Sequence, residues 1–562
     1  MKTALACFLS LLAFPLLAAT KEPLRARHVM VASTSPIASQ IGADVMRKGG
    51  NAVDAAVAVS FALAVTWPSA GNLGGGGFML VRKADGTLDA LDYRERAPLA
   101  ASREMYLDAQ GNVIKRLSID GHRAVAVPGT VAGLALAHQR HGKLKWAELV
   151  EPARKLAADG FEINYHLARL LRKQETIDKM ARFDESRRIF QRNGRFYEMN
   201  ERLVQPELAA TLARLQKNPR DFYEGKTAKL LVAELSAHGG LITLDDLKTY
   251  TPKIRKPLRG TYRGYEIVTM PPPSSGGTTL LEMLNILEAY DLKSMGFQSA
   301  RYFHTVIEAM RRAFADRSEF LGDPDFVKVP VEGLISKKYA NERRKSIDPA
   351  HATPSGEIGP GTPAAYESPN TTHFTIVDAD GNVVSSTFTL NDTFGSGVTV
   401  KGAGFLLNNE MDDFTSKPGE PNDFQLIQGE ANAIAPKKTP LSSMTPAIVL
   451  KDGKVFFAVG SPGGPRIINT VLQVILNVID FGLDLQAAID APRIHHQWMP
   501  DEIYSETLGV NPDTRAALEA MGYKFRVKLE DVGDAQGVMI DPATNMRIGA
   551  SDARLAGAPA GW

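Results

Sequence analysis

Cysteine is almost absent from this chain of 562 residues, because Cys7 is the only one. Cys7 lies in an N-terminal segment that we expect to be removed, so disulfides, cysteine nucleophiles and thiolate metal sites are excluded from the mature protein. A charge excess of either sign is also absent, since 65 Lys and Arg residues face 63 Asp and Glu residues. The basic stripe that phosphate backbones require is missing, and nucleic acid is not an expected partner.

Signs of separate domains are lacking as well. No Pro-rich or Gly/Ser-rich spacer, charge block, repeat or low-complexity tract interrupts the sequence. The length alone suggests roughly three or four domains of about 150 residues each. The uninterrupted pattern and a hydrophobic content of 44% favour one joint globular domain with a large core.

The N-terminus is typical of an export signal. A short positive region at Met1-Lys2 precedes the apolar run Ala4 to Leu17, and small residues then offer a cleavage site at Leu17 to Thr20. The alternative, a membrane anchor, needs about 20 apolar residues and is weakened by Pro15. We expect residues 1–19 to be a signal peptide and the mature protein to lie in the periplasm or to be secreted to the medium.

Helices and strands are both predicted along the chain. The amphipathic segment Ser39 to Lys48 stops at a glycine pair, and Asn51 with Asp54 then resembles a capping box for the apolar run Ala52 to Val65. That run is too short to span a membrane and is predicted to be a buried helix. Further helical patterns cover roughly residues 146–235, 300–321 and the segment after Pro465.

Three hairpins are predicted from alternating segments around turn residues. They combine Phe78–Arg82 with Thr87–Tyr93, Thr371–Val377 with Val383–Leu390, and Ile448–Leu450 with Val455–Val459. Antiparallel hairpins among long helices indicate two packed sheets that helices cover on both outer faces.

The tetrapeptide Asn370-Thr371-Thr372-His373 opens the second hairpin and resembles a buried cleavage point. A threonine hydroxyl is a poor nucleophile without a base, and an N-terminal threonine carries that base in its own α-amine. This interpretation predicts a chain that cuts itself before Thr371. Taken alone, Thr371 is one strand threonine among many.

Eight patterns, including this one, occur in a fixed order over nearly the whole mature chain. They are Gly49–Ala56, Gly71–Phe78, Asp92–Glu95, Met270–Gly277, Thr371–His373, Leu407–Phe414, Pro440–Met444 and Gly460–Gly464. Together these segments resemble the γ-glutamyltransferases.

The resemblance implies the fold and the division of the chain. Members of this family have an α/β fold of the α+β type, the four-layer αββα fold of the N-terminal-nucleophile hydrolases, formed jointly by two subunits of one self-cleaved precursor. The cut is implied between Asn370 and Thr371. Residues 20–370 would then form the large subunit and residues 371–562 the small, catalytic subunit.

The implied chemistry begins with the precursor. The Thr371 hydroxyl would attack the carbonyl of Asn370, and water would hydrolyse the resulting ester. The freed α-amine, with an ordinary pKa of about 7.7–8.0, suits a general base near neutral pH. The mature enzyme would take the γ-glutamyl group from glutathione or a related compound and pass it to water, an amino acid or a peptide. No cofactor is implied.

A binding pocket for the glutamyl group is also implied by the resemblance. Its α-carboxylate needs a cation and hydrogen-bond donors, and its α-ammonium needs carboxylates. The implied carboxylate ligands are Arg94, Ser442 and Ser443, and the implied ammonium ligands are Asn391, Glu410 and Asp413.

Three more residues are implied to act on the reacting bond. Gly463 and Gly464 would present backbone N–H groups to the oxyanion, since they lack side chains and allow close approach. Thr389 would orient the nucleophile across the predicted hairpin. Taken singly, the glycine pair is more often a turn before a helix, and an arginine such as Arg94 is more often part of a surface ion pair.

One position departs from the family pattern. In many bacterial relatives a loop over the pocket carries a tyrosine that bonds to the pocket asparagine, whereas the equivalent stretch Pro418 to Gly429 carries Phe424. A phenylalanine shields the pocket but cannot make that hydrogen bond. We therefore expect a lid that is held more loosely.

No metal is expected in this protein. The adjacent His495 and His496 point in different directions and have no carboxylate at a supporting spacing, so both are interpreted as structural. His373 follows the nucleophile pair, but an N-terminal amine makes a histidine base unnecessary.

Two alternatives remain beside a γ-glutamyltransferase. A sibling acylase that removes glutaryl groups from cephalosporin-type amides would share the fold and the self-cleavage. A glutaryl group has no ammonium, so the presence of both Glu410 and Asp413 argues against an acylase. The other alternative, an uncleaved exported protein that binds γ-glutamyl peptides, has no need of Thr371 and Thr389.

Overall fold

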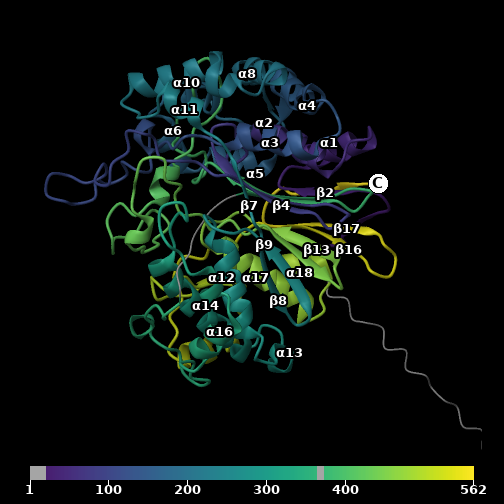
Figure 1. Ribbon diagram of the computed structural model, residues 1–562, viewed down its shortest axis with the longest axis vertical. Coiled ribbons are helices and arrows are strands. Elements are labelled where there is room, and N and C mark those ends of the chain that lie inside the picture. Colours follow the sequence, from purple (N-terminus) through teal and green to yellow (C-terminus); the bar gives the residue numbers. More distant parts are fainter. Residues whose placement is uncertain (1–20, 364–371) are drawn as a thin grey trace, which may run out of the picture.

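Figure 1 shows the computed structural model, which describes residues 21–363 and 372–562. Residues 1–19, expected to be a signal peptide, and the expected cleavage site at Asn370 and Thr371 lie outside the described residues. Two antiparallel sheets of seven strands each lie face to face, and helices cover the outer face of each sheet. The predicted four-layer α/β fold is therefore confirmed.

The first sheet contains two of the predicted hairpins. Its order is β18 (Ala560–Gly561), β2 (Met30–Ser33), β10 (Thr372–Val377), β11 (Val383–Thr389), β3 (Gly76–Arg82), β4 (Leu88–Tyr93) and β7 (Lys253–Arg255). The register pairs Thr372 with Phe388, so Thr389 is the next residue along β11. Strands β10 and β11 occupy the interior of the sheet, which gives their ends a rigid mount.

The second sheet contains the third predicted hairpin. Its order is β1 (Leu24–Ala26), β17 (Arg547–Ser551), β16 (Gln536–Ile540), β13 (Lys454–Gly460), β12 (Ala447–Lys451), β9 (Tyr265–Thr269) and β8 (Leu258–Tyr262). Apolar side chains such as Phe78, Val268 and Ile448 fill much of the space between the two sheets.

His373 is a polar exception between the sheets. Its ring is fully buried and its two nitrogens lie 3.0 Å from the Thr387 hydroxyl and 2.8 Å from the Thr375 hydroxyl. Burial lowers the pKa of His373 to about 3, so the ring stays neutral. A Cβ at Gly460 would lie 2.4 Å from the ring, which explains a glycine at this position. His373 therefore has a structural role in joining the sheets.

One helical layer comes mainly from the first half of the chain. It contains α1 (Pro36–Arg47), α2 (Ala52–Thr66), α3 (Thr130–His141), α4 (Trp146–Asp159), α5 (Tyr165–Leu171), α6 (Gln174–Met180), α7 (Asp184–Phe190), α8 (Pro206–Lys217), α9 (Asp221–Glu224), α10 (Lys226–Ala237) and α11 (Leu244–Thr249). Helix α2 is buried along its whole length. Its predicted capping box is confirmed, since the Asn51 side chain accepts from the Asp54 N–H and Asp54 accepts from the Asn51 N–H.

The other helical layer lies on the second sheet. It contains α12 (Ser275–Leu287), α13 (Leu292–Met295), α14 (Ala300–Phe320), α15 (Val331–Leu334), α16 (Lys337–Arg344), α17 (Arg466–Ile479), α18 (Leu485–Asp490) and α19 (Pro512–Ala520). Two small hairpins, β5 (Phe161–Glu162) with β6 (Arg202–Leu203) and β14 (Ile494–His495) with β15 (Tyr504–Ser505), complete the strands.

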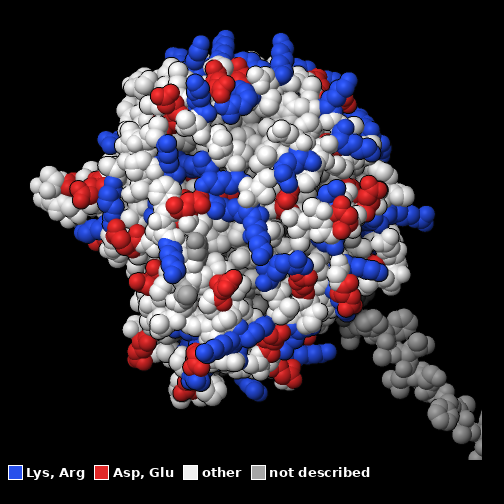
Figure 2. All heavy atoms as spheres, viewed as in Figure 1, with Lys and Arg blue, Asp and Glu red and all other residues white. Residues whose placement is uncertain are grey.

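None of the helices in the described part of the chain combines the length and apolarity that a membrane crossing needs. Figure 2 shows that basic and acidic side chains alternate over the face in view, without a continuous basic stripe. This distribution agrees with the balanced composition.

Candidate active site

Three of the expected pocket residues form one fully buried cluster. Arg94 follows the end of β4, while Glu410 and Asp413 lie in a short 3-10 turn, Glu410–Asp413. The guanidinium of Arg94 donates to Glu410, to Asp413 Oδ2 at 2.6 Å and to the carbonyl of Leu441 at 3.2 Å. Leu441 precedes Ser442 and Ser443, so the structure brings the expected carboxylate and ammonium ligands into one neighbourhood.

Several polar atoms of this neighbourhood are buried without a hydrogen-bond partner among the described residues. The donors are Arg94 Nε and Ser443 Oγ, and the acceptors are Glu95 Oε1, Glu410 Oε2, Asp413 Oδ1 and Asn391 Oδ1. Buried polar groups are nearly always bonded, and each unmet one costs about 1–3 kcal/mol. Two donors and four acceptors left unmet indicate a site that a polar ligand completes.

Glu95 adds a third carboxyl group beside the single guanidinium of Arg94. It is fully buried, with Oε2 3.5 Å from Arg94 Nη1, and it can share a proton with Glu410. Sequence reasoning gave Glu95 no role, although an acidic residue directly after Arg94 was a signal.

The electrostatics of these three carboxyls favour a cationic ligand. Burial raises the pKa of Glu95 to about 7 and that of Asp413 to about 8, against the lowering effect of Arg94. Burial and repulsion by Glu95 likewise raise the pKa of Glu410 above its ordinary value. The cluster therefore holds protons near neutral pH, and a bound ammonium would replace them.

A second group of expected residues lines a cavity of about 360 Å³. Thr389, Asn391, Phe424, Gly463 and Gly464 all line it. The Thr389 hydroxyl accepts from the Asn391 N–H at 2.8 Å, and Asn391 has a left-handed φ of 75°. Arg94, Glu410 and Asp413 do not line this cavity.

Asn391 connects the cavity to the acidic cluster. Its side-chain amide donates to the carbonyl of Asn409 at 3.1 Å, directly before Glu410. Asn408 holds the same segment in place, because its side chain bonds to the carbonyls of Gly74 and Ala126 at 2.8 Å each. The end of β11 and the acidic turn are thus held together.

Gly463 and Gly464 form a tight connection between β13 and α17. Their φ angles are 131° and 62°, in the region that side-chain-bearing residues rarely adopt. A backbone without side chains at the cavity wall, close to the N-terminus of α17, is suited to approach an anionic group.

The segment expected to form a lid lies against the same cavity. The Phe424 N–H donates to Asn422 Oδ1 at 3.1 Å, and its carbonyl accepts from Gln497 Nε2 at 3.0 Å. The end of the segment is fixed by a bond of 2.9 Å from the Thr415 hydroxyl to the carbonyl of Gly429. Phe424 and Asn391 therefore line one cavity.

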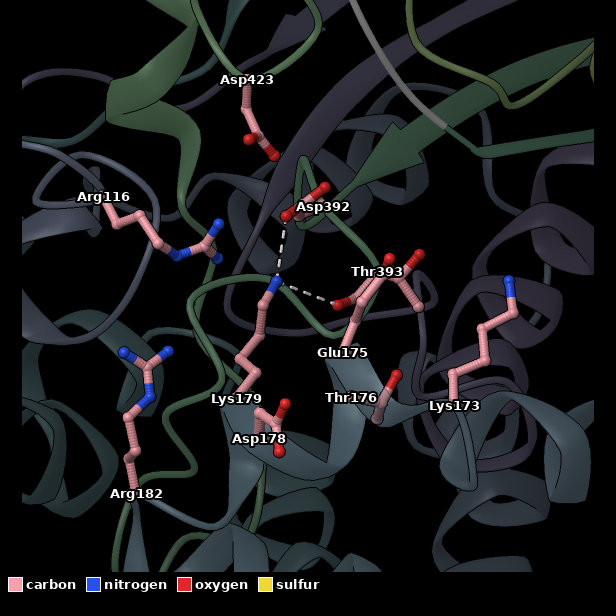
Figure 3. Close-up of a pocket in the computed structure, with 10 residues that line it drawn as sticks. All are labelled: Arg116, Lys173, Glu175, Thr176, Asp178, Lys179, Arg182, Asp392, Thr393 and Asp423. Carbon is pink, nitrogen blue, oxygen red and sulfur yellow. Dashed lines mark hydrogen bonds and ion pairs between the residues drawn. The ribbon is translucent and has the colours of Figure 1, made fainter. Parts of the chain in front are cut away.

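A larger polar cavity of about 640 Å³ adjoins the first and shares Asp392 and Thr393 with it (Figure 3). Lys179 of α6 reaches into it and donates to Asp392 at 2.9 Å and to the Thr393 carbonyl at 3.5 Å. Asp423, in the segment expected to form a lid, also lines it. Burial and repulsion by Asp392 and Asp412 raise the pKa of Asp423 to about 7.

His495 and His496 are buried and bond to different neighbours. His495 contacts Asn469 at 2.7 Å, and His496 lies 3.3 Å from Asp501. Burial lowers the pKa of His495 well below its ordinary value and that of His496 to about 4. The two rings are therefore neutral and bonded to separate partners, and their structural role stays a prediction.

Comparison with known proteins gives the relationship directly. The model of the gamma-glutamyltranspeptidase family matches residues 38–562. The chain is 50% identical over 534 residues to the glutathione hydrolase proenzyme of Escherichia coli. The matched region covers 95% of this chain and 91% of that protein.

Solved structures agree with this relationship. The cephalosporin acylase of Bacillus halodurans has a TM-score of 0.87 at 30% identity over 99% of both chains. The gamma-glutamyltranspeptidase of Helicobacter pylori has a TM-score of 0.57 at 46% identity over 58% of this chain and 94% of that one. This chain belongs to the gamma-glutamyltranspeptidase family.

Proposed function

We propose that this protein is an exported, self-cleaving γ-glutamyltransferase that hydrolyses glutathione and related γ-glutamyl compounds. It also transfers the γ-glutamyl group to amino acids or peptides. The main support is the set of unmet polar atoms around Arg94. These atoms have the hydrogen-bonding character of an amino acid binding site. The family relationship adds the reaction type. The periplasm is the proposed location.

Self-cleavage comes first in the proposed sequence of events. The Thr371 hydroxyl attacks the carbonyl of Asn370, and the ester that forms is hydrolysed by water. The products are a large subunit, residues 20–370, and a small subunit, residues 371–562, which stay associated because their strands alternate within both sheets. Thr371 then carries a free α-amine as its base.

The amino acid end of the donor complements the unmet donors and three of the unmet acceptors. An ammonium group offers three hydrogens, and the buried acceptors are Glu410 Oε2, Asp413 Oδ1 and Asn391 Oδ1. A carboxylate accepts bonds from Arg94 Nε and Ser443 Oγ. Ser442 is proposed to assist Ser443. Binding of a zwitterion therefore adds no net charge to the pocket. It requires only that the carboxyl groups of the pocket lose their protons.

The reacting bond then lies at the adjoining cavity. Thr371 attacks the γ-carbonyl, its amine takes the hydroxyl proton, and the departing amine receives that proton. The N–H groups at Gly463 and Gly464 stabilise the oxyanion, an effect worth about 10²–10³ in rate for a single donor. Thr389 orients the nucleophile. Water or an acceptor amine then cleaves the γ-glutamyl ester of Thr371.

Paired substrates test the proposed donor and the acylase alternative together. The high structural similarity to a cephalosporin acylase makes this alternative specific. The purified protein is assayed with γ-glutamyl-p-nitroanilide and with glutaryl-p-nitroanilide, which differ only in the α-ammonium group. We expect strong preference for the γ-glutamyl compound, because three unbonded acceptors in the pocket can accept hydrogen bonds from an ammonium. Preference for the glutaryl compound would establish the acylase instead.

A further inference from the structure

Two histidines and a glutamate that have no role in the donor pocket form a compact cluster. His122 lies in the short turn His122–Ala124, Glu234 lies in the last turn of α10, and His238 follows the end of that helix. One ligand atom of each of the three residues lies within 4.8 Å of the others. Glu234 and His238 are four residues apart, a spacing that places both side chains on one side of a helix end.

The distances resemble those of a zinc site. His122 Nε2 lies 3.0 Å from Glu234 Oε1, and His238 Nδ1 lies 3.3 Å from the same oxygen. Tetrahedral zinc with bonds of about 2.0–2.1 Å to nitrogen and oxygen holds its ligand atoms roughly 3.3 Å apart. The two distances to Glu234 are close to this value, and the His238 ring must turn before its lone pair faces the ion.

The three side chains already contact one another. Glu234 Oε1 lies against both imidazole rings, and Glu234 Oε2 accepts a hydrogen bond from the Lys401 N–H at 3.3 Å. The rings of His122 and His238 are stacked with centroids 4.4 Å apart.

We propose that His122, Glu234 and His238 bind a divalent transition-metal ion, with Zn²⁺ as the best match. Two imidazoles and one carboxylate are a ligand set that zinc accepts, and water would fill the fourth position. The rings now lie only 20° from parallel, so their lone pairs do not converge. His238 can turn to bind, because its side chain is 54% exposed. Its Nδ1 now donates to the Glu234 carbonyl at 2.9 Å, so binding through Nδ1 breaks this hydrogen bond and moves the ring proton to Nε2.

The site would strengthen the joint between the two halves of the chain. The Lys401 N–H donates to Glu234 Oε2 at 3.3 Å, and the N–H of Gly121, beside His122, donates to the Ser396 carbonyl at 2.9 Å. Both contacts connect residues before the proposed cleavage point with residues after it. A metal ion that joins His122 to α10 would hold both of these contact points in place.

Zinc titration of the untagged, chelator-treated protein tests the proposal. Calorimetry with ZnCl₂ should give one tight equivalent per molecule, and zinc should raise the temperature of thermal unfolding. His122→Ala, Glu234→Gln and His238→Gln should each weaken binding by more than the about 10–100-fold that loss of an outer-shell partner costs. Their unfolding should no longer respond to zinc.

His351→Ala is the matched control, because His351 is an exposed histidine with Asp348 as its only carboxylate partner, 3.6 Å away. It should bind zinc as the wild type does. The proposal is overturned if the wild type binds no stoichiometric zinc, or if His238→Gln binds it equally well. His238→Gln changes a surface side chain, so its unfolding temperature without zinc should match that of the wild type. This match would show that the variant is folded.

Discussion

The environment of Arg94 has an unusual balance of charge for a protein interior. One guanidinium faces the carboxyl groups of Glu95, Glu410 and Asp413, and all four side chains are fully buried. Charges buried in this way are costly unless partners satisfy them. The excess of carboxyl groups over cations is best explained by a cation that arrives with the substrate.

Replacing Asp413 by asparagine should weaken donor binding. The variant removes the carboxyl group that must ionise to bind an ammonium, and this group is also the partner that Arg94 contacts at 2.6 Å. Loss of one member of a buried charge pair costs about 2–5 kcal/mol, so KM for γ-glutamyl-p-nitroanilide should rise by roughly 30-fold or more. Steady-state kinetics measures this. Glu430→Gln, in an exposed pair with Arg103, is the control and should leave KM unchanged; equal KM values in wild type and Asp413→Asn would contradict the pocket assignment.

Donor affinity should also depend on pH. Because burial raises the pKa of Glu95 to about 7 and of Asp413 to about 8, both are protonated below these values and lose their protons as the pH rises through them. An ammonium binds best to the ionised forms. The inhibition constant of L-glutamate should therefore fall between pH 6 and pH 8, and this fall should be smaller in Asp413→Asn. A constant value across that window in the wild type would argue against the protonated cluster.

At the scale of secondary structure, local patterns were sufficient for many elements. The capping box at Asn51, the turn between β10 and β11 and the apolar positions of α17 each involve residues close together in sequence. Their physical causes act over a few residues, and the sequence predicts them. By contrast, the sequence around the short helix α6 does not predict the bond from Lys179 to Asp392, because that contact joins positions 213 residues apart.

The turn of the β10–β11 hairpin is also an anchor for α2. Asp378 is buried and accepts hydrogen bonds from the N–H groups of Ala52 at 2.9 Å, Asp380 at 3.0 Å and Asn382 at 2.9 Å. Asp378→Ala should lower the free energy of unfolding by about 2–3 kcal/mol, since it leaves buried donors unmet. Thermal unfolding measures the loss. The exposed neighbour Asp380 is the control, and an Asp378→Ala unfolding temperature equal to that of Asp380→Ala would refute this anchoring role.

The lid should respond to a single hydroxyl group. Phe424 and Asn391 line one cavity, and Asn391 Oδ1 has no partner among the described residues. In Phe424→Tyr, a hydroxyl that reaches this oxygen adds a hydrogen bond worth about 1 kcal/mol and holds the lid more firmly. We expect altered rates of hydrolysis and transfer, measured with and without glycylglycine as acceptor. Unchanged rates for both reactions would show that the lid is not loosely held.

At the scale of the whole molecule, the site depends on the packing of two sheets. Arg94 follows a strand of the first sheet, and Gly463 follows a strand of the second. The sequence indicates two sheets and the types of residue, and the family resemblance supplies their roles. Neither the sequence nor the resemblance predicts the ionic state of the pocket. The raised pKa values of Glu95 and Asp413 come from burial that only the assembled fold creates.

Self-cleavage before Thr371 is the central claim, and mass spectrometry of the purified protein tests it most directly. Wild-type protein should give two chains, the smaller of which begins at Thr371, and should release p-nitroaniline from γ-glutamyl-p-nitroanilide. Thr371→Ala should remain a single chain and be inactive, because it lacks the hydroxyl that attacks Asn370. A wild-type protein that stays full-length and is nevertheless active, or a Thr371→Ala protein that is still cut at this bond, would contradict the account.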